Sequence, residues 1–532
     1  MAALVTSAPE LGPEELRRLL ATAATGARGL VLAVGAGGYI DAPGTVALLV
    51  ADEQRKFNGD RAAYLHVSPL APHDGLAPDG PAPFVFVVIL DGAERGIATL
   101  GSLTLALGSL AAGPLAALPR LLAVHALAGH RPEAVAALAT ALRPRHAFFW
   151  VHDFSAACGN KALLRNGREF CNAPKPTSMA CRICAHGPDR PMHIARVRAL
   201  FSAVDFMVVA PSAPALALFR AATDFSAAGH LVHPHMQLGA PEGPDLPPAE
   251  GSRAAFAGPA TAANGFLRFS TLAAKVHGAA FFHFAAPGEH RELPGVTPIE
   301  AVATATKPFA LVRALAEHRI DFLLALAPWP EPFPAAALAA RATGAMVLTT
   351  DTTMQANDNT VVLPDDAALA EFLADGAKQP RRAAPLLHVG STATIALASD
   401  IPAITDAPDV HLLVGGVRLE GARIGDAYRF ALPETAEPRR VVRLRSRSLH
   451  GAWDRAAEGE RRRLGIAVAS LLLDGADVPP GDPRRAGGWH KPEPEWQWTD
   501  GDAGLLVGTA RQVEVTIRPL GRYWRSPLLA AP

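Results

Sequence analysis

The amino-acid sequence predicts an α/β protein with two Rossmann-like domains and an all-β domain behind them. Up to about residue 400, buried strands alternate with helices, a pattern typical of mostly parallel sheets. A segment rich in Pro, Gly and acidic residues at 240–252 divides this region into two parts. After about residue 405, short strands separated by turn residues follow one another. We therefore predict domains at 1–240, 253–400 and 405–532, the last of them a β-sandwich.

The composition is that of a folded protein with several domains. The chain has 532 residues, of which 49% are hydrophobic and 19% are charged. Lys plus Arg and Asp plus Glu number 50 each, so charge gives no reason to expect a nucleic-acid partner. The N-terminus has no signal-peptide pattern, and the apolar runs are interrupted by Gly, Ser and Pro. We expect a cytoplasmic protein without a transmembrane segment, and contact with a membrane surface stays open.

The first part opens with the buried strand RGLVLAVGA at 28–36, which runs into a turn containing Gly35, Gly37 and Gly38. The helix-like stretch GTVALLVADEQRKF follows, and the three pieces together indicate the opening of a Rossmann-like unit. An ordinary tight turn is the alternative. A dinucleotide-dependent oxidoreductase is not favoured, because the glycines do not follow G-x-G-x-x-G and no acidic residue ends an obvious second strand.

Further strands are expected wherever apolar runs are bounded by turn residues. In the first part these runs lie at 62–69, 83–92, 120–127, 146–154 and 204–212. In the second part they are AAFFHFAAP, IDFLLALAP and AMVLTTD, with the helices ALVRALAEHR and PAAALAARATG between them. In the last part they are VHLLVGGVRL, RRVVRLRSRS, GIAVASLLLDG and RQVEVTIRPL. The arginines of RRVVRLRSRS alternate along their strand, so we expect them on one solvated face.

All four cysteines, Cys158, Cys171, Cys181 and Cys184, fall within 27 residues, in an insert at 158–184. The last two have the C-x2-C spacing that lets two thiolates bind one metal ion, and zinc favours four such ligands. A structural zinc ion is therefore predicted here. Unligated thiols, a redox pair and disulfides are the alternatives, and a reducing compartment disfavours disulfides. A catalytic zinc ion is not expected, because four cysteines leave no open position.

Motifs around and beyond the cysteines have a recognisable order. They are WVHDFSAAC at 150–158, CRIC at 181–184, VVAPS at 208–212, VHPH at 232–235, DFLLALAPWPEPF at 321–333 and GAMVLT at 344–349. In order, spacing and residue type, these motifs resemble bacterial glycosyltransferases of the group-1, retaining GT-B class. The resemblance covers residues 120–380 well and residues 28–115 loosely. The β-domain is similar to a module that accompanies such transferases.

The resemblance implies transfer of a sugar from a nucleotide sugar to a saccharide acceptor, with surface polysaccharide synthesis as the expected setting. It implies catalytic roles for His152, which follows a strand, and for Glu331 in the W-P-E loop. A capping or packing role is the alternative for His152 and Asp153, and a solvated surface glutamate is the alternative for Glu331. No divalent metal is expected in catalysis, because no D-x-D motif follows a suitable strand. Donor or acceptor binding is expected at Gly37, Gly38, Asp153, Ser212, Asn264, Gly265 and Pro330.

The donor site departs from the family pattern at two positions. Glu331 matches the first glutamate of the family's acidic pair, but Ala339 stands at the second. Asn264 stands where a lysine is expected beside the phosphates, so a positive charge is lost. Arg268 taking over the phosphate role is one alternative. A catalytically inactive homologue that binds a glycan or a protein is the other.

Overall fold

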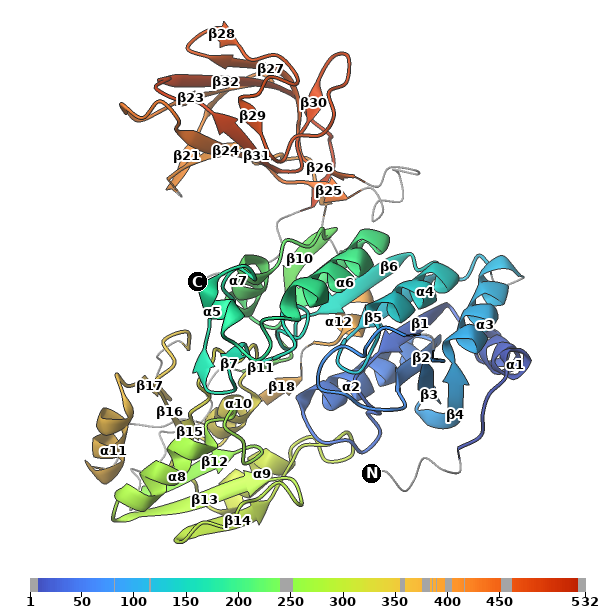
Figure 1. The fold of residues 1–532 in the computed structure, drawn as a ribbon, viewed down its shortest axis with the longest axis vertical. Helices are drawn as coiled ribbons and strands as arrows, with labels where there is room; N and C mark the ends of the chain where they lie inside the picture. Colours follow the sequence, from blue (N-terminus) through green and yellow to red (C-terminus); the bar gives the residue numbers. More distant parts are fainter. Residues whose placement is uncertain are drawn as a thin grey trace. The chain divides into compact units, whose positions relative to one another are not determined.

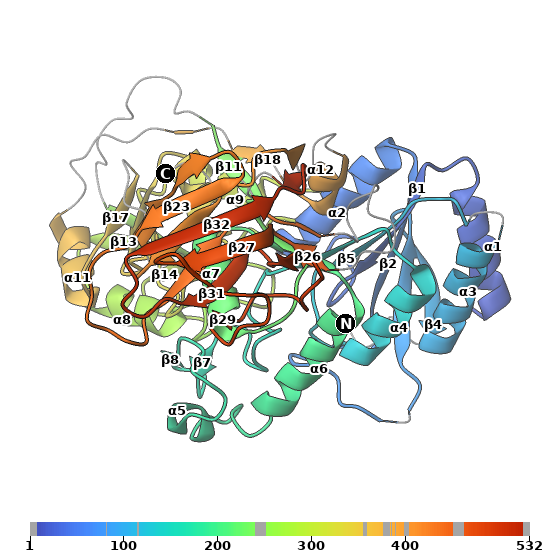
Figure 2. The same ribbon diagram turned by 90° about the horizontal axis from the view of Figure 1, so that it is seen from above.

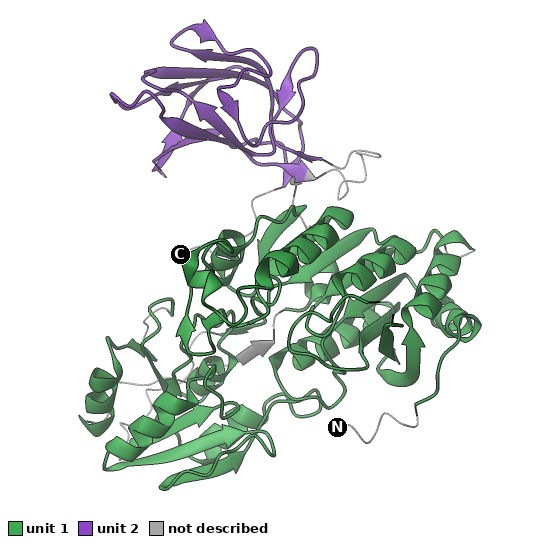
Figure 3. Cartoon of the chain, in the orientation of Figure 1, with its two compact units in different colours: residues 1–397 green, residues 398–532 purple. Residues whose placement is uncertain are grey.

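The structure is a computed structural model, and it describes residues 8–80, 82–113, 116–239, 252–354, 359–375, 383–384, 386–388, 390–397, 404–415, 417–450 and 462–524. The chain divides into two compact units, Met1–Leu397 and Ala398–Pro532 (Figure 3). Apart from Ser252, the linker expected at 240–252 lies outside the described residues. No helix within the described ranges has the length and apolar character needed to cross a bilayer.

The first half of unit 1 is built on an eight-stranded sheet (Figure 1). Its strands run parallel except for β3, which is antiparallel to both of its neighbours, β2 and β4, at one edge. All six strands expected here are present. The sequence did not predict β10 and β4, because β10 is short and β4 has no apolar run. In sheet order the strands are β10 (Gly229–Val232), β9 (Phe206–Ala210), β6 (His146–Trp150), β5 (Arg120–Val124), β1 (Gly29–Val34), β2 (Ala62–Pro69), β3 (Val85–Leu90) and β4 (Ala93–Thr99).

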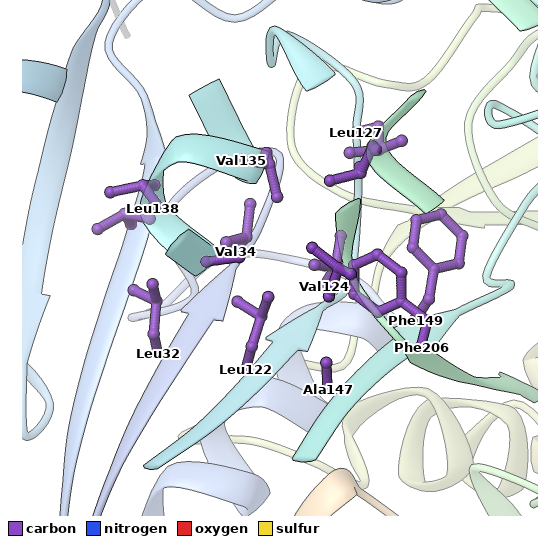
Figure 4. Packing of buried hydrophobic residues seen from close by; sticks show 14 of the residues in the cluster. Leu32, Val34, Leu122, Val124, Leu127, Val135, Leu138, Ala147, Phe149 and Phe206 are labelled. Atoms are coloured by element: carbon purple, nitrogen blue, oxygen red, sulfur yellow. The ribbon is translucent and has the colours of Figure 1, made fainter. Parts of the chain in front are cut away.

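Helices cover both faces of this sheet, which explains why its central strands are apolar on both sides. α2 (Thr45–Gly59) lies on one face (Figure 2). In Figure 4, Leu32, Val34 and Leu122 of the sheet lie beneath Val135 and Leu138 of α4. The helices that share this buried cluster are α1 (Pro13–Ala24), α3 (Leu100–Ala112), α4 (Pro132–Leu142), α6 (Arg190–Ala203) and α7 (Ala213–Ala222).

The second half of unit 1 is built on a six-stranded, fully parallel sheet. Separate buried clusters lie on its two faces, one under α8 and α11 and the other under α9 and α10. The strands in order are β14 (Val296–Glu300), β13 (Ala279–Ala285), β12 (Ser252–Ala257), β15 (Phe322–Ala325), β16 (Met346–Thr349) and β17 (Thr360–Val362). The helices are α8 (Phe266–Lys275), α9 (Ala310–Glu317), α10 (Ala335–Ala342) and α11 (Asp366–Asp375).

The chain returns to the first half before unit 1 ends. β11 (Met236–Leu238) pairs antiparallel with β18 (Leu386–His388), and α12 (Thr392–Leu397) then packs against α2. The segment 386–397, which the sequence analysis placed in the second domain, therefore packs against the first half of unit 1. The two Rossmann-like halves predicted from the sequence are confirmed.

Unit 2 is an all-β domain with two antiparallel sheets that share one buried core. One sheet has the order β21 (Val417–Glu420), β20 (His411–Val414), β24 (Val441–Arg445), β31 (Asp502–Leu506) and β29 (Arg485–Ala486). The other has β22 (Ala422–Ile424), β23 (Ala427–Ala431), β32 (Gln512–Arg518), β27 (Ala467–Leu473) and β28 (Ala476–Asp477), with β30 (Gln497–Trp498) beside β27. Short pairs join β19 (Ile404–Thr405) to β33 (Tyr523–Trp524) and β25 (Leu449–His450) to β26 (Arg463–Leu464). The predicted β-sandwich is confirmed.

The two arginines of β24 lie on its outer, partly exposed face, as their alternation predicts, but acidic partners neutralise them. Arg443 and Arg445 both pair with the carboxylate of Asp502 on the neighbouring strand. Arg440 is only 8% exposed and donates to the carbonyl oxygens of Pro433 and Ala510. These positive charges are therefore compensated within the domain.

Candidate functional site

A cavity of about 430 Å³ opens at the carboxyl edge of the first sheet. We call it the first cavity. Its wall contains residues from four parallel strands: Gly37 and Gly38 after β1, His66 in β2, His125 after β5, and His152 and Asp153 after β6. Carboxyl ends of parallel strands meet at one edge, which is where open α/β sheets bind ligands. The structure thus brings together four residues that the sequence placed in the site.

The glycine turn after β1 has its closest packing at Gly35. A Cβ atom at Gly35 would lie 2.5 Å from His66 Nε2, whereas one at Gly37 would meet nothing within 4 Å. The carbonyl oxygen of Gly35 also accepts a hydrogen bond of 2.7 Å from His130 Nε2. Glycine is therefore required here for the approach of a histidine ring, and the binding role of Gly37 and Gly38 stays a prediction.

Four side chains form a continuous hydrogen-bonded chain, which we call the Glu53–His235 chain and which reaches the cavity wall at His125 and His152. His125 Nε2 lies 3.2 Å from Glu53 Oε1. His125 Nδ1 lies 3.2 Å from His152 Nε2, and His152 Nδ1 lies 3.0 Å from His235 Nε2. Glu53, His125 and His235 are at most 2% exposed, and His152 is half-buried where it meets the cavity.

The carboxylate of Glu53 determines which atom donates and which accepts in each hydrogen bond of the Glu53–His235 chain. It also accepts hydrogen bonds from the Tyr64 hydroxyl at 2.9 Å and from the Thr392 N–H at the start of α12 at 2.8 Å. An ionised carboxylate only accepts, so His125 donates through Nε2 and accepts at Nδ1. By the same step His152 donates to His125 and His235 donates to His152. The Nδ1 atom of His235 remains a buried acceptor without a partner in the part of the chain that the structure describes.

Burial keeps His66, His152 and His235 neutral, because it disfavours the charged form. Burial lowers the pKa of His66 and of His235 to about 3, and neighbouring histidines add to the effect. Burial, together with His235 and His125, holds the pKa of His152 well below its usual range. At physiological pH His152 and His235 can therefore act as neutral hydrogen-bonding groups within this chain.

Both ring nitrogens of His152 are occupied by other histidines. A sugar hydroxyl can bond to this ring only if one of these two hydrogen bonds is broken. The catalytic role expected for His152 stays a prediction. Sequence reasoning missed its partners Glu53 and His125, whereas His235 was part of the VHPH motif but was not assigned to the site. One signal was present, since His125 directly follows β5 as His152 follows β6.

Two of the expected binding residues have local structural partners. One carboxylate oxygen of Asp153 accepts from the Ser155 N–H at 2.8 Å, which closes a turn after β6. Ser212 caps α7 by accepting from the Ala215 N–H at 3.3 Å. Its hydroxyl also donates to the carbonyl oxygen of Pro332 at 2.9 Å, which joins the two halves of unit 1. Ligand binding by Asp153 and Ser212 stays a prediction.

The W-P-E-P-F loop lies at the junction of the two halves. Trp329 donates to the carbonyl oxygen of Ala263 at 3.0 Å, and its ring stands edge-on to Phe154, with ring centroids 6.0 Å apart. The ring of Phe333 lies against that of His235, with centroids 4.7 Å apart. This loop, which also contains Pro330, is therefore fixed by contacts on both sides.

Glu331 in this loop is exposed to solvent, although protein surrounds it closely on most sides. This crowding and the negative charge of Asp351 raise the pKa of the Glu331 carboxyl to about 7. Near neutral pH the carboxyl therefore exchanges between a neutral and an ionised form. A carboxyl with such a pKa is well suited to proton transfer or to balancing charge in a reaction.

A second cavity of about 200 Å³ lies between the halves. Residues of α2, of the ends of β12 and β13, and of α10 line it, and most of them are apolar. Ala339 is one of them, so the position expected to carry the second glutamate is part of an apolar wall. Glu289 is the only charged residue among the described residues of this lining.

Asn264 and Gly265 lie before α8 at the carboxyl edge of the second sheet. Gly265 has a φ of 86°, and a Cβ atom there would lie 2.1 Å from the Leu326 carbonyl oxygen, so only glycine fits. The guanidinium of Arg268 pairs with Asp366 and donates to the Thr350 hydroxyl at 2.9 Å. The cation that the sequence offered for phosphate binding is therefore already paired.

The four cysteines lie in the insert that contains β7 (Leu164–Arg165), β8 (Glu169–Phe170) and α5 (Met179–Arg182). All four are free thiols, of which Cys158 and Cys181 are buried. Burial raises the pKa of the Cys158 thiol. Within the described ranges, no three His, Cys, Asp or Glu side chains are arranged to hold a metal ion. The predicted zinc ion stays a prediction.

A buried arginine organises this insert. Arg190, at the start of α6, is 2% exposed. Its guanidinium donates to the carbonyl oxygens of Ala157 at 3.0 Å and Pro174 at 2.5 Å, and to Cys181 Sγ at 3.5 Å. One cation thereby ties three separate points of a long loop to the base of the insert, which is the role that the sequence assigned to a metal.

We expect Arg190→Met to lower the free energy of unfolding by about 2–4 kcal/mol, because the buried carbonyl oxygen of Ala157 and the partly buried one of Pro174 lose their donor. Denaturant unfolding measures this change, and Arg182→Met, at an exposed arginine of the same insert, is the matched control. Zinc analysis of the purified protein accompanies the measurement. Unchanged stability together with one zinc ion per chain would show that a metal organises the insert instead.

Similarity to known proteins is found at the level of solved structures. No protein-family model and no curated protein matches the sequence. Sucrose-phosphate synthase from Thermosynechococcus elongatus is 12% identical, over 65% of this chain and 88% of that chain, with a TM-score of 0.42. A glycosyltransferase from Rickettsia africae is 10% identical, over 65% and 86%, with a TM-score of 0.38. A UDP-forming α,α-trehalose-phosphate synthase from Burkholderia vietnamiensis is 11% identical, over 66% and 91%, with a TM-score of 0.35.

Proposed function

We propose that the protein is a cytoplasmic, retaining glycosyltransferase that moves a sugar from a nucleotide sugar to a saccharide acceptor in surface polysaccharide synthesis. The observation that carries this proposal is the position of Glu331. Its accessible carboxyl lies in the loop that joins two Rossmann-like halves, with a pKa of about 7. In such a transfer the bond from the sugar to the diphosphate breaks and a bond to an acceptor hydroxyl forms. An ionised Glu331 would stabilise the positive charge that develops on the sugar.

The first cavity is suited to the acceptor. It combines apolar residues such as Pro43 and Val46 with the polar groups of Asp74, Asp153 and Lys161. Apolar walls with a few placed polar groups are typical of sites for small polar ligands. A saccharide presents both hydroxyl groups and apolar ring faces, so it matches this lining.

A second candidate function is a catalytically inactive homologue that binds a glycan or a protein partner. The second cavity favours it, because its lining is apolar and its one charged described residue, Glu289, is acidic. A diphosphate is an anion and gains nothing from such a wall. Asn264 supplies no positive charge, and Arg268 reaches a phosphate only if it leaves Asp366.

Calorimetric titration with UDP, GDP and TDP separates the two candidates. For the transferase we expect one nucleotide to bind near micromolar affinity. No binding by a folded sample would instead support the inactive homologue, and glycan arrays would then identify its ligand.

Transfer from the nucleotide sugar that binds tests Glu331 itself. We expect Glu331→Gln to lower the turnover rate about 100-fold or more, because charge stabilisation of the transition state is lost. The rate of the unchanged protein should rise with pH through about 7, since the carboxylate forms above the raised pKa. Glu317→Gln, at an exposed glutamate of α9, is the matched control. Equal rates for both variants would rule out a catalytic role for Glu331.

A further inference from the structure

The insert that carries the cysteines has a charge pattern unlike that of the whole chain. Positive and negative residues balance in the full sequence, but between residues 158 and 192 six positive residues stand against two negative ones. Arg168, Lys175 and Arg182 are exposed and have no acidic partner within the described ranges. The six positive residues are Lys161, Arg165, Arg168, Lys175, Arg182 and Arg190, and the two negative residues are Glu169 and Asp189.

Large apolar side chains are exposed in the same insert. Met179 is 70% exposed, Ile183 is 62% exposed and Met192 is 66% exposed. A folded protein exposes single apolar side chains often, but three in one short segment indicate a contact surface. Met179 and Ile183 are four residues apart across α5, a spacing that places them on the same side of the helix.

The residues of this surface are held close to one another. The Asn166 side chain accepts from the Ala185 N–H at 2.9 Å, which joins the turn before Arg168 to the segment after α5. The contact of Arg190 with Cys181 holds the first turn of α6, which contains Met192, against α5. Figure 2 shows α5, β7 and β8 projecting from the rest of unit 1. We call the surface of Arg168, Lys175, Met179, Arg182, Ile183 and Met192 the basic tip.

We propose that the basic tip docks the protein on an anionic lipid surface. Lys and Arg side chains near a membrane are attracted to acidic headgroups. Apolar side chains among them enter the boundary between headgroups and acyl chains, as in other interfacial anchors. The tip supplies both contributions, and its own contacts through Asn166 and Arg190 give it a fixed shape.

A lipid surface fits the tip better than other anionic partners. The tip projects outward, and a bilayer can accept a projecting surface that a protein partner would have to enclose in a groove. Single-stranded nucleic acids bind largely by stacking on exposed aromatic rings. The insert contains one residue of the types Phe, Tyr and Trp, which is Phe170, and its ring is half-buried against the core of the first half.

Docking would also bring the first cavity to the membrane, because Lys161 of the same insert belongs to the cavity wall. If the proposed transfer is correct, the acceptor is then a saccharide carried on a lipid. This consequence rests on the proposed function, whereas docking itself does not.

Co-sedimentation of the full chain with vesicles tests the proposal without nucleotide or sugar. Vesicles of phosphatidylglycerol and phosphatidylcholine at about 3:7 are compared with pure phosphatidylcholine. We expect binding to the anionic vesicles, falling steeply with salt. The triple variant Arg168→Gln, Lys175→Gln, Arg182→Gln should bind about 100-fold more weakly, at roughly fivefold for each charge. The double variant Met179→Ser, Ile183→Ser should lose about 10-fold or more.

Leu105→Ser and Leu267→Ser are the controls, since these leucines are 63% and 60% exposed on α3 and α8, outside the tip. Both should bind the vesicles like the unchanged protein. Equal binding to zwitterionic vesicles, an equal loss in the controls, or no binding to anionic vesicles would each overturn the proposal. In the last case the tip would be assigned to a protein partner. Circular dichroism and melting curves confirm that each variant is folded.

Discussion

Lowering the pH from 7.5 to 5 is expected to reduce the free energy of unfolding of unit 1 by roughly 6 kcal/mol. His66, His130 and His235, all at most 2% exposed, cause this loss. Burial lowers the pKa of His66 and His235 to about 3 and that of His130 to about 4, from the ordinary 6.5. The unfolded chain binds protons below about pH 6.5 that the folded chain does not, so stability is complete above this pH. Each histidine then costs about 1.4 kcal/mol per pH unit as the pH falls towards 4.

Hydrogen exchange measured by mass spectrometry can follow this loss in unit 1 separately from unit 2, because it reports on individual segments. Peptides that cover β2 and β5 should lose protection steeply between pH 6 and pH 4.5, after correction for the intrinsic exchange rate. His235→Gln removes one titrating group and keeps a side-chain N–H that can donate to His152. Its stability should therefore fall less steeply with acid, by about 1.4 kcal/mol per pH unit. Identical slopes for the variant and the unchanged protein would contradict a buried, neutral His235.

The fold could be predicted where burial leaves a continuous apolar run. β2 lies at Ala62–Pro69, the run expected at 62–69, because both of its faces are covered. β4, with the sequence AERGIAT, has no such run and forms through pairing with β3, which a local pattern does not reveal. The packing of α12 against the first half of unit 1 was missed for a similar reason. α12 has only six residues and is placed by its contacts with α2, more than 300 positions earlier in the sequence.

The candidate site could be predicted only in part. Gly37, Gly38, His152 and Asp153 follow strands, so their meeting at one edge follows from parallel topology. Glu53 was missed because an acidic residue in a helix is usually solvated. Its spacing was nevertheless informative, because it lies four residues from the buried Leu49 and four from the buried Phe57, on the same side of α2.

The cysteine insert shows a different limit of sequence reasoning. The spacing of its four cysteines correctly indicates that they gather in one loop, and burial of two of them follows. The spacing does not indicate that Arg190, six residues after the last cysteine, enters the same loop. A cation at the centre of a loop and a metal ion at its base have similar effects on order, but only the metal has a sequence signature.

Replacing Glu53 by Leu is expected to lower the free energy of unfolding by about 3–6 kcal/mol. The Tyr64 hydroxyl, the His125 ring and the Thr392 N–H all donate to this one carboxylate, which is 0% exposed. Leucine leaves these donors buried without an acceptor, and each unsatisfied group costs about 1–3 kcal/mol. The loss of the Thr392 bond should also release α12 from α2, so peptides from α12 should exchange hydrogen fastest.

Glu53→Gln should lower the free energy of unfolding by less, about 1–3 kcal/mol, because the donors and acceptors of the histidine rings can exchange roles. The amide oxygen can accept from the Thr392 N–H while the amide nitrogen donates to the Tyr64 oxygen and to His125 Nε2. His125 then donates to His152 and His152 donates to His235, which leaves the N–H at His235 Nδ1 buried and unpartnered within the described structure. The Tyr64 hydroxyl also loses the acceptor that Glu53 provided. Denaturant unfolding of both variants, with Glu15→Leu at an exposed position of α1 as the control, measures the difference. Equal losses for Gln and Leu would mean that the three histidines keep a fixed direction, whereas a smaller loss for Gln identifies Glu53 as the group that sets it.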